Sequence, residues 1–167
     1  DLTGLLEVTG RLTSLRLDDV IGGQISIRTD MSSLLDVRSK VSIFMDQVAD
    51  TAITTNDLKI KTLRTTEWLD TAGDDIISAP SIGRLLAAGR TGAVIAGDFH
   101  ASLDLAGNEQ LTKTLGSASI KGNLGTDADN PVSWDITGQV GGVKVRGEVQ
   151  GWDITIRDGN GVTGDLA

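Results

Sequence analysis

The chain has 167 residues, no cysteine and a formal net charge of −8. The lack of cysteine excludes a disulfide framework and a cysteine nucleophile, an acidic balance argues against a protein that binds nucleic-acid phosphates, and no apolar run reaches the roughly 18 residues that span a membrane. Hydrophobic residues make up 39% of the chain but aromatic residues only 3%, which predicts one folded domain with a core of Val, Ile, Leu and Ala.

The first predicted strand is "TGLLEVTG", which begins at Thr3. Its two glycines are six positions apart, and the residues between them alternate, as in a strand with one buried face. Leu6 and Val8 are expected to point inward and Glu7 outward. Because the chain opens on this strand, without an initiating Met or a leader, we expect a piece of a longer protein. We also expect its open first coil to pair end to end with another copy, or with the preceding segment of the parent protein.

The stretch from about residue 29 to 80 has no clear register. The segments "VSIF", "AITT" and "LKIKTL" have the composition of strands. "SSLLDVRS" and "TTEWLDTAG" are compatible with strands or with a short helix. We therefore expect residues 1–167 to form a single domain in which this stretch is irregular.

The second half of the chain repeats the opening pattern three times. "IGRLLAAG" from Ile82, "LGSASIKG" from Leu115 and "VGGVKVRG" from Val140 each carry two glycines six positions apart, and "SWDITG" and "GWDITI" follow as a second strand in consecutive copies. The spacing gives a unit of about 18 residues, with a seven-residue insertion at 126–132. The alternation predicts that Leu6, Val8, Leu85, Ala87, Ile120, Val143, Val145, Ile136 and Ile154 point inward and that Glu7, Lys144, Arg146 and Asp153 point outward.

A unit this short cannot bury its own apolar face, so its copies must stack on one another. We therefore predict an all-β fold, a parallel β-solenoid (β-helix) with roughly 18-residue coils and loop insertions. An antiparallel β-sandwich is the alternative, because short glycine-rich strands also suit that fold. The hairpin signals Asn-Gly and Asp-Gly are confined to "RDGNG" near the C-terminus, which favours the solenoid. The glycines are expected where φ is positive or where backbones approach closely.

The segments "SIGRLLAAG", "LGSASIKGNL" and "VGGVKVRGEVQGWDI" resemble the degenerate repeats of very large bacterial secreted or surface proteins that contain parallel β-helical arrays. The resemblance covers the second half of the chain well and the first half weakly. It implies an extracellular or cell-surface location and a structural or adhesive role, and it brings no catalytic residue to this chain.

His100 is the only histidine, which excludes a site with several histidine ligands. Asp98 and Ser102 are close in sequence, but residues two apart in a strand share a face without the geometry of a catalytic triad. We therefore expect His100 to be a solvent-facing strand residue, and we predict no catalytic residue and no required cofactor.

Two oxygen-rich clusters are calcium candidates. Asp127 and Asp129 lie in the insertion, and Asp158, Asn160 and Asp165 lie near the C-terminus. The second cluster lacks the distal bidentate Glu of a calcium loop. We interpret both as solvated loops and expect no metal to be required for folding.

Trp134 and Trp152 occupy the same repeat position one coil apart. They are interpreted as stacked core residues, and the alternative is an exposed aromatic ladder for sugar rings. Arg90, Lys121 and Arg146 are expected on the outer surface, as is usual for charged residues of a solenoid.

Three functions are weighed. The first is a non-enzymatic structural or adhesive β-solenoid segment of a larger secreted or surface protein. The second is a carbohydrate-active β-helix, such as a calcium-dependent polysaccharide lyase, and the third is a self-assembling filament subunit. The expected partners are another solenoid end and a carbohydrate or surface ligand, with no nucleic acid and no membrane span.

Overall fold

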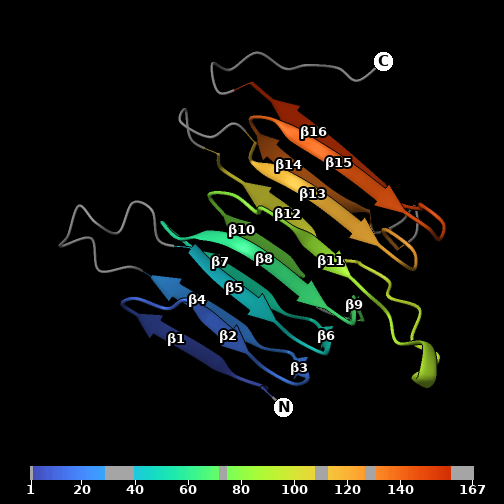
Figure 1. The fold of residues 1–167 in the computed structure, drawn as a ribbon, viewed down its shortest axis with the longest axis horizontal. Helices are drawn as coiled ribbons and strands as arrows, with labels where there is room; N and C mark the ends of the chain where they lie inside the picture. The colour runs from blue at the N-terminus through green and yellow to red at the C-terminus, as the bar shows by residue number, and fades with distance from the viewer. Residues whose placement is uncertain (1, 29–39, 72–74, 108–112, 127–130, 159–167) are drawn as a thin grey trace.

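The computed structural model describes residues 2–28, 40–71, 75–107, 113–126 and 131–158. These residues form a parallel β-solenoid, in which the chain winds repeatedly past the same sides of one stack (Figure 1). Every pairing between named strands is parallel. The solenoid prediction is therefore confirmed, and the antiparallel sandwich is excluded as the alternative.

Three sheets make up the sides of the solenoid. The seven-stranded sheet contains, in spatial order, β1 (Leu5–Thr9), β4 (Gln24–Arg28), β7 (Ala52–Thr55), β10 (Ile76–Ala79), β12 (Ser102–Leu105), β14 (Val132–Thr137) and β16 (Trp152–Arg157). The six-stranded sheet contains β2 (Ser14–Arg16), β5 (Lys40–Phe44), β8 (Lys59–Thr65), β11 (Leu85–Ala87), β13 (Leu115–Ile120) and β15 (Val140–Val145). The three-stranded sheet contains β3 (Val20–Ile21), β6 (Gln47–Ala49) and β9 (Glu67–Leu69), and a 3-10 turn spans Thr91–Ala93.

The predicted register of the paired-glycine strands is correct in the second half of the chain and wrong at its start. Leu85 pairs with Ala118, and Ala118 pairs with Val143, which is the predicted register of three copies. The fourth copy, at Leu6, lies in β1, and β1 belongs to the seven-stranded sheet. The error arose because strands of both sheets share the same inward alternation, so sequence pattern alone does not separate them.

The coils are longer than the predicted 18 residues. Along one column of paired residues in the seven-stranded sheet, the successive differences in residue number are 19, 28, 24, 26, 31 and 20 (Leu6, Ile25, Ile53, Ile77, Leu103, Trp134 and Ile154). The variation arises in the connections between strands, whereas the strand pairing stays parallel throughout. The sequence period was therefore obscured by loops of different length.

The stretch that lacked a register continues the same three sheets. "VSIF" and "AITT" lie in β5 and β7, and all of "LKIKTL" except Leu58 lies in β8, as predicted. "TTEWLDTAG" contributes strand β9 rather than a helix. One register shift between Val41 and Ser42, where β5 meets β8, interrupts the regular pairing. "SSLLDVRS" lies outside the described residues.

Burial of the inward side chains depends on their position along the stack. Leu85, Ala87, Ile120 and Ile136 are fully buried, and Leu6, Val8, Val145 and Ile154 are half-buried. The predicted burial of Val143 is wrong, because 37% of this residue is exposed. Val143 shares the inward phase of its buried partner Ala118, but it lies on β15, the last strand of its sheet. Glu7, Lys144, Arg146 and Asp153 are exposed, as predicted.

Aromatic side chains form an internal column. Trp68, Phe99 and Trp134 are completely buried, and their rings meet edge to face, with centroids 5.7 Å and 6.2 Å apart. The half-buried Trp152 extends the column, with its ring 5.3 Å from that of Trp134. The interpretation of both tryptophans as core residues is confirmed, although the register differs by two residues because Trp152 pairs with Val132.

The paired glycines of the repeat allow close packing between coils. Gly83, Gly116 and Gly141 follow one another along the six-stranded sheet, and a Cβ atom on Gly116 would overlap the carbonyl oxygen of Gly83. A Cβ atom on Gly141 would likewise overlap the carbonyl oxygen of Gly116. In the three motifs of the six-stranded sheet, the first glycine is therefore required by close backbone approach and not by a positive φ, whereas a Cβ atom on Gly4 would meet nothing within 4 Å.

Candidate functional site

His100 does not belong to an assembled catalytic triad. The Ser102 hydroxyl oxygen accepts a hydrogen bond from the backbone N–H of Ser133 at 3.1 Å, and the Asp98 carboxylate accepts one from Asn123 at 2.6 Å. His100 Nδ1 is buried and has no hydrogen-bond partner in the described part of the chain. The expected exposure of His100 is only partly right, because the side chain is half-buried and this burial lowers its pKa.

The calcium candidates lie mostly outside the described residues. Asp127, Asp129, Asn160 and Asp165 lie outside the described residues. Asp158 is described, follows β16 directly and is exposed. The interpretation of both clusters as solvated loops, with no metal required for folding, therefore stays a prediction.

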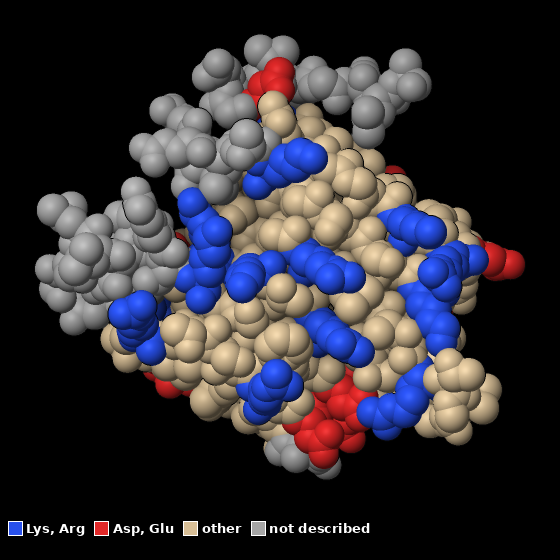
Figure 2. Space-filling view, in the orientation of Figure 1, with Lys and Arg blue, Asp and Glu red and all other residues tan. Residues whose placement is uncertain are grey.

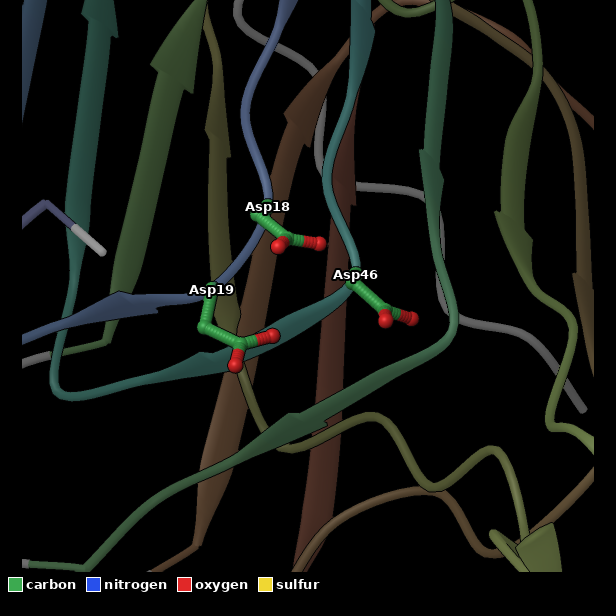
Figure 3. A group of neighbouring side chains, drawn as sticks. All are labelled: Asp18, Asp19 and Asp46. Atoms are coloured by element: carbon green, nitrogen blue, oxygen red, sulfur yellow. The ribbon is translucent and has the colours of Figure 1, made fainter.

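A different aspartate cluster lies beside the three-stranded sheet. Asp18 and Asp19 precede β3, Asp46 precedes β6, and their carboxylate oxygens lie within 4.8 Å of one another (Figure 3). Arg90 contacts Asp46 at 2.5 Å, and the Asp19 carboxylate accepts the backbone N–H of Gln47 at 3.2 Å. The Thr66 hydroxyl and the Arg90 guanidinium hold the pKa of Asp46 below its ordinary value. Oxygen sets of this kind suit hard cations, but Arg90 already supplies positive charge at this corner.

Asp75 is a buried carboxylate with a structural role. It accepts hydrogen bonds from the backbone N–H of Thr51 at 2.8 Å and from the indole N–H of Trp68 at 2.5 Å. Burial raises the pKa of Asp75 to about 6, and the nearby carboxylates of Asp70 and Asp50 act in the same direction. Asp75 therefore anchors the first ring of the aromatic column. The strand alternation gave a signal for it, because Asp75 shares the inward phase of Ile77.

The outer surface of the seven-stranded sheet has a shallow hollow at its N-terminal end. The hollow has a volume of about 390 Å³ and is lined mainly by outward residues of β1, β4 and β7, among them Leu5, Glu7, Arg28 and Thr54. Glu7 and Arg28 are exposed, and their charged groups are 4.0 Å apart. An open hollow with one loose ion pair gives no convergent set of polar groups for a small ligand.

The outer surface of the six-stranded sheet is strongly basic. We call it the basic face; it consists of the outward cations of the sheet and those directly next to its strands (Arg16, Lys40, Lys59, Lys61, Arg64, Arg84, Lys121, Lys144 and Arg146). Figure 2 shows Lys and Arg side chains spread across this face, with acidic side chains only at its margin. The sequence analysis placed Lys121, Lys144 and Arg146 on the outside, but it missed the basic face because the strands of this sheet lie far apart in the chain.

Comparisons with protein-family models, with curated proteins and with solved structures find no match to this chain. No helix in the described ranges is long and apolar enough to cross a membrane. The assignment of function therefore depends on the surfaces of the solenoid itself.

Proposed function

We propose that this chain is a non-enzymatic structural and adhesive β-solenoid segment of a larger secreted or cell-surface protein. In this role its coils extend a stack formed with neighbouring solenoid segments, and its outer faces are available to bind ligands. The observation that supports the proposal best is the state of the two terminal coils.

The inward side chains at both ends are incompletely covered within the described residues. At the first coil, Leu2, Leu6, Leu12, Leu15 and Leu17 are only half-buried, although they pack against the core. At the last coil the inward residues Val143 and Val149 are 37% and 50% exposed. Apolar cross-sections of this kind are covered in native solenoids by a further coil or by a cap.

Strand edges at both ends support the same role. The edge strands are β1, β2 and β3 at one end and β15 and β16 at the other. All of these strands run parallel to their neighbours, so the last coil of one segment can pair with the first coil of the next without a change of direction. A head-to-tail contact of this kind does not close on itself and builds an open stack.

Light scattering across a range of protein concentrations tests the end-to-end contact. We expect the solution mass to rise from 17.5 kDa in whole multiples as the concentration increases. The double variant Val143→Lys/Val149→Lys places charge on the exposed inward positions of the last coil, and charged edges oppose strand pairing. We expect this variant to stay monomeric at concentrations where the unmodified chain assembles.

A matched control is Thr54→Lys/Ser78→Lys, which adds the same charge to outward positions of the central strands β7 and β10. We expect the control to assemble like the unmodified chain. A chain that is strictly monomeric at high concentration, or a control that loses assembly as completely as the end variant, would overturn the proposal.

A further inference from the structure

The strands of the two large sheets differ in the sign of their charge. The strands of the six-stranded sheet contain six Lys or Arg residues and no Asp or Glu. The strands of the seven-stranded sheet contain four acidic and two basic residues. Because the whole chain has a net charge of −8, the basic face reverses the sign of the molecule on one side.

The cations of the basic face are available to a ligand. No ion pair in the described residues involves any of them, whereas Arg28, Arg90 and Arg157 elsewhere are each paired with a carboxylate. Arg16 lies over the ring of Phe44, 4.4 Å from its centroid. An array of unpaired cations repels itself unless an anion is present, so a bound polyanion would relieve this repulsion.

The geometry of the face favours a long ligand. Arg16, Arg64 and Lys144 lie in one column of paired residues that crosses all six strands, with Phe44, Leu86 and Ser119 between them. Adjacent strands are about 4.8 Å apart, so the column extends over roughly 24 Å. Ser14, Ser42 and Thr62 add hydroxyl groups in the neighbouring column. A ligand that follows the column meets cations and hydroxyls along its whole length.

The chemistry of the face distinguishes among classes of polyanion. Single-stranded nucleic acids bind to aromatic stacking platforms, but the one aromatic residue of the column, Phe44, is covered by Arg16. Membrane-surface binding needs exposed apolar anchors beside the cations, and Leu86, the aliphatic residue of the column, is half-buried. The acidic remainder of the chain also repels any extended, densely charged surface. A thin single chain that carries its carboxylates on successive sugar rings contacts only the basic face.

We propose that the basic face binds an acidic polysaccharide, a linear chain of carboxylate-bearing sugars that lies across the six strands. Carboxylates pair with Lys and Arg, and sugar hydroxyls hydrogen-bond with the interleaved Ser and Thr side chains. This inference rests on the proposed function, because it supplies the binding surface that an adhesive segment requires.

Isothermal titration with polygalacturonate tests the inference, with uncharged dextran as the control ligand. We expect binding to polygalacturonate that weakens at least tenfold between low and high salt, and no binding to dextran. The variant Lys61→Gln/Arg64→Gln removes two cations from the centre of the face and should weaken binding at least fivefold. Arg28→Gln/Arg157→Gln removes the same charge from the seven-stranded sheet and should change the affinity less than twofold.

The inference is overturned if polygalacturonate does not bind at low salt, or if both double variants weaken binding equally. It is also overturned if a DNA duplex or phosphatidylserine vesicles bind more tightly than polygalacturonate at the same ionic strength. Circular dichroism confirms that each variant is folded. Assembly is measured separately, by light scattering without polysaccharide. Loss of binding with normal assembly therefore contradicts only this inference, and loss of assembly with normal binding contradicts only the proposed function.

Discussion

The middle coils of the solenoid bury their inward side chains completely, whereas the end coils leave the equivalent side chains half exposed. Ile53 and Ile77 are 0% exposed, but Leu6 and Ile154 in the same column are only partly covered. The residue types are alike, so the difference comes from the number of neighbouring coils. Stability in this fold is therefore a property of the contact between coils more than of any single coil.

The largest difference between middle and end coils is expected in the aromatic column. Trp134 is completely buried, contacts rings on both sides, and donates its indole N–H to the carbonyl oxygen of Ala101 at 3.2 Å. We expect Trp134→Ala to lower the free energy of unfolding by about 3–5 kcal/mol, because it removes a large side chain and leaves a cavity. Among the described residues, Trp152 has a neighbouring coil on one side only, and Trp152→Ala should lower the free energy of unfolding by about 1–2 kcal/mol.

Urea denaturation followed by far-ultraviolet circular dichroism measures both losses, with Thr155→Ala on the outer surface of β16 as the control. If the two tryptophan variants were equally destabilised, the last coil would be as well packed as the middle ones. That result would remove the contrast between middle and end.

The alternation of residues, and with it the class of fold, could be read from the sequence because most inward positions of the strands are apolar. Leu85, Ala118 and Val143 were even placed in their true register. The sheet to which a strand belongs could not be read, as Leu6 shows, because both sheets bury the same residue types. The predicted coil length was wrong for a related reason, because the connections between strands vary in length independently of the strands.

The candidate surfaces were harder to predict than the fold. Outward charges such as Arg64 and Lys144 looked ordinary one strand at a time, and their common column depends on pairing between segments far apart in the chain. The aspartate cluster of Asp18, Asp19 and Asp46 likewise joins two coils. Asp75 was not predicted either, although the alternation that turns Ile77 inward also turns Asp75 inward.

A second test compares a glycine in a middle coil with a glycine in the last coil. A Cβ atom on Gly116, in β13, would overlap the backbone of Gly83, whereas one on Gly142, in the last strand β15, would meet nothing within 4 Å. We expect Gly116→Ala to destabilise the fold by about 1–3 kcal/mol, because backbone atoms cannot move aside cheaply. Gly142→Ala should stay within about 0.5 kcal/mol of the unmodified chain.

Thermal and urea unfolding of the two glycine variants provide the measurement. A tolerated Gly116→Ala would mean that the coils separate locally at little cost, and the account of the paired glycines would then be wrong. Equal losses at both positions would instead indicate that a neighbouring coil also packs against β15 in solution.

The smallest expected effect concerns charge in the middle of the stack. Asp75 is 6% exposed and its pKa is raised from 3.8 to about 6, chiefly by burial. The folded state therefore holds this proton more tightly than the unfolded state does, so stability falls as the pH rises from about 4 to about 6 and is level above that range. When solvent screening is included, the free energy of unfolding decreases by on the order of 1–2 kcal/mol over this pH range.

Asp75→Asn isolates this contribution, since the amide oxygen still accepts the hydrogen bonds from Trp68 and Thr51 but does not titrate. The lowered pKa of Asp46 acts below about pH 4, and that of His100 makes stability rise with pH, so neither imitates the effect. We expect the difference in unfolding free energy, variant minus unmodified chain, to increase between pH 4 and 6. Asp153→Asn, an exposed change on the last coil, should give a flat difference. Parallel pH profiles of unfolding free energy for Asp75→Asn and the unmodified chain would contradict this expectation. They would show that Asp75 is freely accessible to water, and that the middle coils exclude water no better than the end coils.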